Sequence, residues 1–161
     1  MMRFLGYLIL LALLGYGLWP YYAVYQLDDA INQEDTTELA ALVDLAAIRG
    51  HYKARIADGV EGVLPAGDAD GVTHWLRQNI GEIGDVALEQ AITLPWARQA
   101  LREAVGRATS QNPPYLLAAI DYAFFESYDR FLVRIGELGK APTHVRLELE
   151  GREWRITDII R

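Results

Sequence analysis

The chain has 161 residues, of which 52% are apolar, with a formal net charge of −7 and no cysteine. Such a composition is too apolar for a disordered protein. The acidic balance argues against a nucleic-acid-binding protein and against binding of the folded domain to an anionic lipid surface. The lack of cysteine excludes a disulfide, a thiolate nucleophile, a cysteine zinc site and a lipoprotein cysteine. The length suits one domain with a membrane anchor.

An uncharged apolar run occupies residues 4–27 and ends in a group of aromatic residues, Trp19, Tyr21, Tyr22 and Tyr25. As a helix it would measure about 36 Å, which exceeds the roughly 30 Å hydrocarbon core of a bilayer. Aromatic residues are typical of the membrane–water interface. We therefore predict a membrane anchor in residues 1–27 and a single extracytoplasmic domain in residues 28–161. A cleaved signal peptide and a buried helix of a soluble core remain alternatives.

The charges on either side of this run indicate its orientation. Arg3 precedes it, whereas the following segment carries only acidic charges until Arg49 (Asp28, Asp29, Glu34, Asp35, Glu38 and Asp44). By the positive-inside rule, the N-terminus should lie in the cytoplasm and the domain on the other side of the membrane.

The first predicted helices are marked by caps and apolar spacing. Pro20 should kink the first helix or start a new one, and residues 21–33 continue with Val24, Leu27 and Ile31 on one side. Asp35 with Glu38 has the spacing of a capping box for a short helix over residues 36–43. Asp44 should cap the next helix, whose buried stripe is Ile48, Tyr52, Ile56 and Val60. A catalytic role for Asp44 is the less favoured alternative.

The middle of the chain is less regular. The turn-forming residues of the segment 64–71 predict a polar loop. The spacing of Asp68 and Asp70 hints at a calcium loop, but no glutamate completes that pattern, so the plain loop is favoured. Short helices are expected over residues 72–83 and, capped by Asp85, over residues 86–92. A longer helix over residues 95–108 should begin at Thr93 and Pro95 and bury Trp96, Ala100, Leu101 and Val105. Residues 115–126 suit a helix as far as Ile120 and a strand after it.

The C-terminal residues 131–161 alternate apolar and polar side chains in three segments. This period of two predicts an antiparallel sheet of about three strands with one apolar face that the helices cover, so the predicted fold class is α+β. A two-residue turn at Glu150 and Gly151 would place Leu147 opposite Trp154. A four-residue loop of the same parity is also compatible with the apolar face.

Two blocks carry a resemblance. They are residues 25–56, with Asp35, Leu39, Val43, Asp44 and Arg49, and the strands that contain Phe131 to Val133 and Trp154 to Ile159. Together they resemble the bacterial family called domain of unknown function 2939. The resemblance implies an N-terminal signal or anchor, a helical region and a C-terminal sheet, but no activity. For a bacterial protein, the orientation predicted from the charges places the anchor in the inner membrane and the domain in the periplasm or outside. The order of helices and curved sheet is similar to the nuclear-transport-factor-like cone folds, as an analogy of fold alone.

No motif in the sequence specifies a reaction. His51, His74 and His144 lack the spacing of a metal pair, and neither a nucleophile elbow nor a phosphate-binding loop is present, so no metal or cofactor is expected. The weak candidates for a catalytic site are Asp158, Asp129 and His74. A buried Asp158 would need a partner, either Arg130 or Arg134, unless a bulge turns it outward and lets Ile159 or Ile160 pack.

Two functions follow from these observations. The favoured one is a membrane-tethered, non-catalytic module that binds an envelope protein or a small ligand. The alternative is a small hydrolase or isomerase with a carboxylate acid/base site in a cone-shaped pocket. An enzyme needs at least two titratable groups that converge in a concave site.

Overall fold

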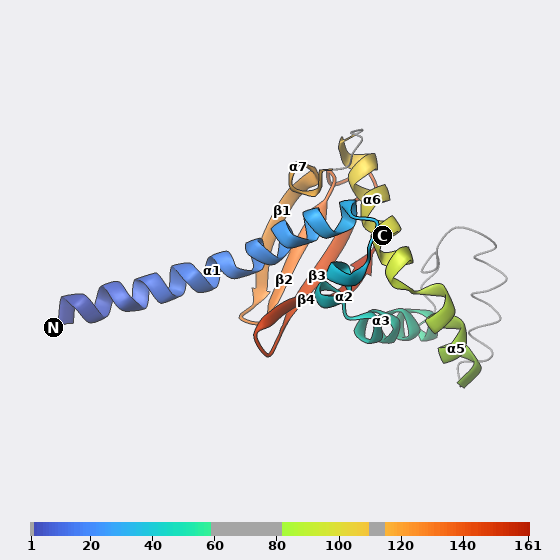
Figure 1. Ribbon diagram of the computed structural model, residues 1–161, viewed down its shortest axis with the longest axis horizontal. Coiled ribbons are helices and arrows are strands. Elements are labelled where there is room, and N and C mark those ends of the chain that lie inside the picture. The colour runs from blue at the N-terminus through green and yellow to red at the C-terminus, as the bar shows by residue number, and fades with distance from the viewer. Residues whose placement is uncertain (1, 59–81, 110–114) are drawn as a thin grey trace.

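The computed structural model describes residues 2–58, 82–109 and 115–161, and these form an α+β fold (Figure 1). A long N-terminal helix crosses one face of a C-terminal antiparallel sheet, and the other helices flank it. The helices are α1 (Met2–Asn32), α2 (Thr37–Leu42), α3 (Leu45–Ala57), α5 (Glu82–Ala91), α6 (Leu94–Thr109) and α7 (Leu116–Ala119). The strands are β1 (Ile120–Ser127), β2 (Arg130–Ile135), β3 (Thr143–Glu150) and β4 (Glu153–Ile160).

Helix α1 has two halves with different surroundings. Residues 4–15 are exposed along their whole length, whereas Ala23, Val24, Leu27, Ala30 and Ile31 are buried in the domain. The helix continues through Pro20, so no new helix begins there. Proline cannot donate a hydrogen bond to the carbonyl four residues earlier, but packing of the residues after it keeps the helix in place. The predicted division of the chain at residue 27 stays a prediction; the first contacts between α1 and the sheet lie at Tyr16.

The cap of α3 is confirmed and the capping box of α2 is wrong. The Asp44 carboxylate accepts a hydrogen bond from the Ala47 N–H at 3.0 Å, and the stripe of Ile48, Tyr52 and Ile56 is buried as predicted. Helix α2 begins one residue later than expected. The Asp35 carboxylate accepts hydrogen bonds from the N–H and the hydroxyl of Thr37, at 3.0 and 2.7 Å. The Glu38 carboxylate instead accepts a hydrogen bond from the Gln33 side chain. Val60 of the predicted stripe lies outside the described residues.

Helix α5 begins at Glu82, so Asp85 lies inside it and does not cap it; the Asp85 carboxylate pairs with Lys53 at 2.5 Å. Helix α6 buries Ala97, Ala100, Leu101, Ala104 and Val105, close to the predicted side. The loop at residues 64–71 and most of the helix predicted over residues 72–83 lie outside the described residues.

The sheet has four strands in the order β1-β2-β3-β4, one more than predicted. The additional strand β1 begins at Ile120, where the change from helix to strand was expected. The register of the last hairpin differs from the prediction, because Leu149 lies opposite Trp154 and Leu147 lies opposite Ile156. The turn is formed by Gly151 and Arg152, and Gly151 has a φ of 65°. Glycine adopts this positive φ without steric cost, whereas the predicted turn would have required it of Glu150.

A bulge in β4 changes the faces of its last residues. Arg146 pairs with Asp158 while Leu147 pairs with Ile156, so Thr157 is the extra residue on β4. The bulge expected as an alternative is therefore confirmed: Asp158 lies opposite Arg146, and Ile159 packs in the core.

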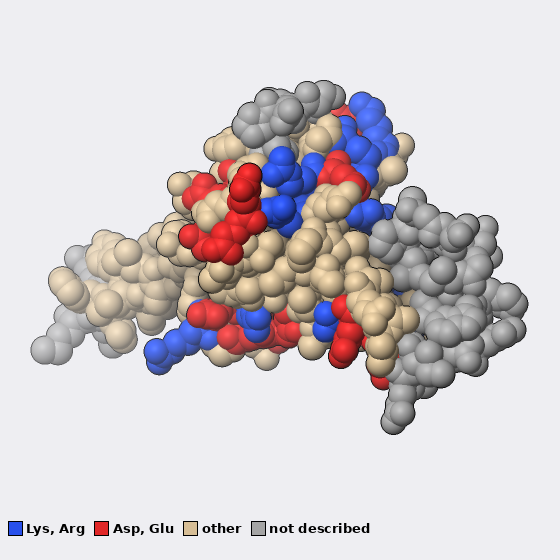
Figure 2. Space-filling model, turned by 45° about the vertical axis from the view of Figure 1, so that its right-hand side comes forward, with Lys and Arg blue, Asp and Glu red and all other residues tan. Residues whose placement is uncertain are grey.

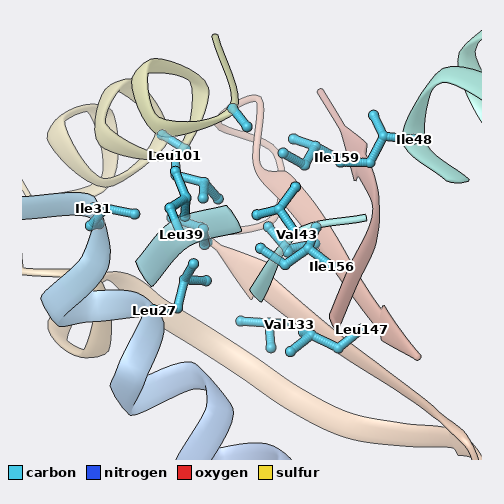
Figure 3. Packing of buried hydrophobic residues seen from close by; sticks show 14 of the residues in the cluster. Leu27, Ile31, Leu39, Val43, Ile48, Leu101, Val133, Leu147, Ile156 and Ile159 are labelled. Carbon is cyan, nitrogen blue, oxygen red and sulfur yellow. The ribbon is translucent and has the colours of Figure 1, made fainter. Parts of the chain in front are cut away.

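The core lies between the helices and the inner face of the sheet (Figure 3). Leu27 and Ile31 of α1, Leu39 of α2 and Leu101 of α6 approach Val133, Leu147 and Ile156 of the strands. Trp154 is only 2% exposed, which confirms its expected burial, and it contacts Phe125 of β1 and Phe131 of β2 edge to face.

Candidate functional site

A groove of about 620 Å³ lies where α1 joins the domain. Helix α1 forms one wall with Trp19, Tyr22 and Tyr25, α2 contributes Glu38, Ala41 and Leu42, and the β3–β4 hairpin closes the groove with Arg152, Glu153 and Trp154. Trp19, Tyr22 and Tyr25 all face the groove, because residues three apart lie on the same side of a helix. The sequence indicated these aromatic residues as an interfacial belt, but it did not indicate that the hairpin lies against them.

The groove combines aromatic rings with an excess of negative charge. Three carboxylates line it, those of Asp29, Glu38 and Glu153, against the single guanidinium of Arg152. The buried indole N–H of Trp154, which belongs to the lining, has no hydrogen-bond acceptor among the described residues. Aromatic faces and carboxylates together attract organic cations. The groove is therefore suited to a ligand that carries positive charge beside apolar groups.

Asp158, the first predicted catalytic residue, lies in a closed cluster of charges. Its carboxylate is 1% exposed and receives two hydrogen bonds from Arg55 of α3, at 2.7 and 2.9 Å. Arg146 lies 3.7 Å away and also bonds Glu126. The partners predicted for Asp158, Arg130 and Arg134, are wrong, because α3 wraps past β4 and brings Arg55 over the bulge. Both oxygens of Asp158 are occupied by guanidinium groups, which fits a structural role.

Asp129, the second candidate, lies in the turn between β1 and β2. Asp158 lies near the C-terminal end of β4, at the end of the sheet away from this turn. The Asp129 carboxylate accepts a hydrogen bond from the Ser127 hydroxyl at 2.6 Å, and its carbonyl accepts one from the Leu149 N–H. His74, the third candidate, lies outside the described residues. The structure does not bring Asp129 and Asp158 together, and the catalytic hypothesis stays a prediction.

A second pair of carboxylates was missed in the sequence. The Asp44 and Glu150 side chains interact, and the Arg155 guanidinium donates hydrogen bonds to Glu150 at 3.2 Å and to the carbonyls of Ala40 and Val43. Burial and then the hydrogen bond to Asp44 raise the pKa of Glu150. Burial by itself raises the pKa of Asp44, but hydrogen bonds from Ala47 and Glu150 outweigh it, so the pKa lies below its usual value. The cluster joins the α2–α3 connection to β4, and no local sequence pattern relates residues so far apart.

The histidines have no metal-binding arrangement in the part of the chain that the structure describes. No group of three His, Cys, Asp or Glu side chains that could hold an ion occurs among these residues. His144 is half-buried on the outer face of β3, where burial and then the charge of Arg134 lower its pKa.

Fold and groove together define a small α+β domain that continues into an N-terminal helix, and this helix is long and apolar enough to cross a membrane by length and composition. Residues 9–111 match the model of the family described as "Protein of unknown function (DUF2939)", and the chain belongs to this family. The match includes the first block of the resemblance and ends before the sheet. Comparison with curated proteins gave no match, and comparison with solved structures gave none. The likeness to the nuclear-transport-factor-like folds stays a prediction.

Proposed function

We propose that the protein is a membrane-anchored binding module, held by α1 on the outer side of the bacterial inner membrane. The groove between α1, α2 and the β3–β4 hairpin is its binding site. The observation that carries the proposal is this groove, which combines three aromatic side chains on its α1 wall with an excess of carboxylates at the place where the helix joins the domain. Its ligand is a small molecule or a segment of an envelope protein with positive charge.

The exposed half of α1 supports the anchor. Residues 4–15 are exposed and uncharged, and Figure 2 shows that the protruding helix has an uncharged surface while the charged side chains gather on the domain. A soluble protein rarely exposes so continuous an apolar surface. Arg3 before the helix and the acidic residues after it support a cytoplasmic N-terminus.

Protease added to spheroplasts tests this orientation. The domain should be degraded while the spheroplasts remain intact, and a cytoplasmic marker protein should survive. Full protection of the domain until the membrane is lysed would contradict the proposed orientation.

Matched tyrosine variants test the groove. Tyr22, 60% exposed, lines the groove, whereas Tyr122, 51% exposed, lies on β1 outside it. Tyr22→Ala should fail to restore the phenotype of a deletion strain, and Tyr122→Ala should restore it. Both proteins should melt within about 2 °C of the unmodified protein, because surface substitutions change stability little. Equal rescue by both variants would remove the groove from the proposal.

The same strain tests the acid/base alternative. Asp129→Ala, Asp158→Ala and His74→Ala should each retain function in proportion to the folded protein that remains. Loss of function in one of them with an unchanged melting temperature would replace the binding module by an enzyme.

A further inference from the structure

The protruding part of α1 is too short to cross a bilayer without the domain touching it. Residues 4–15 are the exposed stretch, and twelve helical residues measure about 18 Å. The hydrocarbon core of a bilayer is about 30 Å thick and needs about 20 helical residues. Counted from Phe4, the first residue of the apolar run after the charged Arg3, the twentieth residue is Ala23, which is buried in the domain. Tilting the helix would shorten its reach across the bilayer further.

The tips of two hairpins lie beside the residues of α1 that follow its protruding part. The Tyr16 hydroxyl donates a hydrogen bond to the Tyr128 carbonyl in the β1–β2 turn, and the Tyr16 ring stacks on Phe125. Trp19 and Tyr22 line the groove together with Arg152 of the β3–β4 turn. Both tips therefore lie at the level of residues 16–22 along the helix, which the bilayer must reach.

The tips carry side chains suited to a phospholipid headgroup layer. Tyr128 is 78% exposed, and Arg130 and Arg152 are exposed beside it on the two turns. Arg152 makes no ion pair with a described residue. Tyrosine and arginine are favoured at this depth, where a ring meets the acyl boundary and a guanidinium meets phosphate. The tips also carry the carboxylates of Asp129, Glu150 and Glu153. Asp129 accepts a hydrogen bond from Ser127 and Glu150 pairs with Arg155, so the docking depends on the anchor and on Tyr128, Arg130 and Arg152, and not on the net charge of the tips.

We infer that the hairpin tips, residues 127–130 and 150–153, dock into the phospholipid headgroup layer of the leaflet from which α1 emerges. The inference rests on the proposed anchoring by α1. The headgroup layer adds about 5–8 Å on each side of the hydrocarbon core. Residues 4–19 measure about 24 Å as a helix, so the core of roughly 30 Å thins locally around the anchor when the tips lie at headgroup depth. The domain is then fixed against the membrane by three points, and the mouth of the groove beside Trp19 and Arg152 opens at the membrane surface.

Spin labels on single cysteines test the docking, because the chain has no cysteine of its own. The full chain is reconstituted in vesicles of phosphatidylethanolamine and phosphatidylglycerol, and label depth is measured from accessibility to oxygen and to a water-soluble nickel complex. Tyr128→Cys and Arg152→Cys report on the two tips separately. Leu138→Cys is the matched aqueous control, since Leu138 is 73% exposed in the β2–β3 turn at the other end of the sheet. Leu11→Cys reports on the anchor.

Labels at residues 128 and 152 should lie at headgroup depth, with nickel accessibility at least threefold below that at residue 138. If both tip labels are as accessible as residue 138 while residue 11 is in hydrocarbon, the docking is overturned and the anchor stands. If residue 11 is also in water, the proposed anchoring itself fails. Circular dichroism of each labelled protein shows that the fold is intact.

Discussion

The two faces of the sheet use alternate residues of the same strands but are held together differently. The inner face, with Phe131, Val133, Leu147 and Trp154, is closed by helices and excludes water. The outer face carries exposed rings such as Tyr122 and ion pairs between strands: Arg134 of β2 pairs with Asp121 of the neighbouring β1, and Arg146 of β3 pairs with Glu126 of β1 across β2. Stability should therefore depend on packing at one face and little on individual charges at the other. The bulge at Thr157 is the exception, because it buries a charge on the outer side.

The largest expected effect is on the inner face. Trp154→Ala should lower the free energy of unfolding by about 3–5 kcal/mol, because it removes a buried ring and leaves a cavity. Tyr122→Ala on the outer face should cost below about 1 kcal/mol. Urea unfolding of both proteins in detergent measures the difference. A cost below about 1 kcal/mol at Trp154 would mean that the inner face is not the core.

A smaller effect is expected at the buried charge. Asp158→Ala should cost about 2–3 kcal/mol, below the roughly 3–5 kcal/mol of a fully buried pair, because the Arg55 and Arg146 side chains keep 22% and 23% of their exposure and can be rehydrated. Asp121→Ala breaks an exposed pair with Arg134 by the same change and should cost about 0.2–1 kcal/mol. Equal costs for the two variants would contradict the burial of Asp158.

The backbone beyond the bulge offers a finer test. The buried Tyr52 hydroxyl donates a hydrogen bond to the Ile159 carbonyl at 2.8 Å. Tyr52→Phe keeps the ring and should cost about 1 kcal/mol, the net value of one such bond. Chemical denaturation gives the cost, and faster hydrogen exchange confined to β4 would locate it. An unchanged stability would show that water replaces the hydroxyl.

The smallest effect concerns pH and the outer face. Burial and the charge of Arg134 hold the pKa of His144 below its ordinary 6.5, so the unfolded chain binds more protons just below that pH. The free energy of unfolding should therefore fall as pH drops through about 6.5 toward the lower pKa of the fold. His144→Gln should remove this part of the dependence, and Arg134→Gln should reduce it, in unfolding curves at pH 7.5 and 5.5. A steeper dependence in His144→Gln would reverse the sign and reject the explanation.

Local patterns in the sequence predicted the local features of the fold. Alternation in the last 31 residues placed the correct side chains on the inner face, and the Asp44 cap and the Ile48 stripe followed from helical spacing. The hairpin parity was also correct, since a shift of two residues leaves every side chain on its own face. The predicted position of the turn was wrong by one residue. The first turn residue, which has the positive φ, is Gly151 and not Glu150, and this position sets the register of the hairpin.

The remaining features depend on contacts between distant segments. Arg55 reaches Asp158 across 103 residues, and nothing in either neighbourhood indicates the other. The apolar run at residues 4–27 is uniform in composition, so the sequence does not show where its exposed part ends and where its buried part begins. The groove has the same origin: its aromatic residues were recognised, but its shape comes from the β3–β4 hairpin that lies beside them.

The short parallel bridge between Val43 and Ile156 has a consequence for self-association. The Asp44 N–H bonds the Ile156 carbonyl at 2.9 Å, so part of the β4 edge is already satisfied. An open edge strand is a template on which a second chain can add as a new strand, and capping the edge prevents this form of aggregation. At the opposite edge, two irregularities in β1 interrupt the regular ladder that a foreign strand would extend. Within residues 2–58, 82–109 and 115–161, neither edge of the sheet therefore offers a long, regular strand along which the sheets of two copies could join into fibrils.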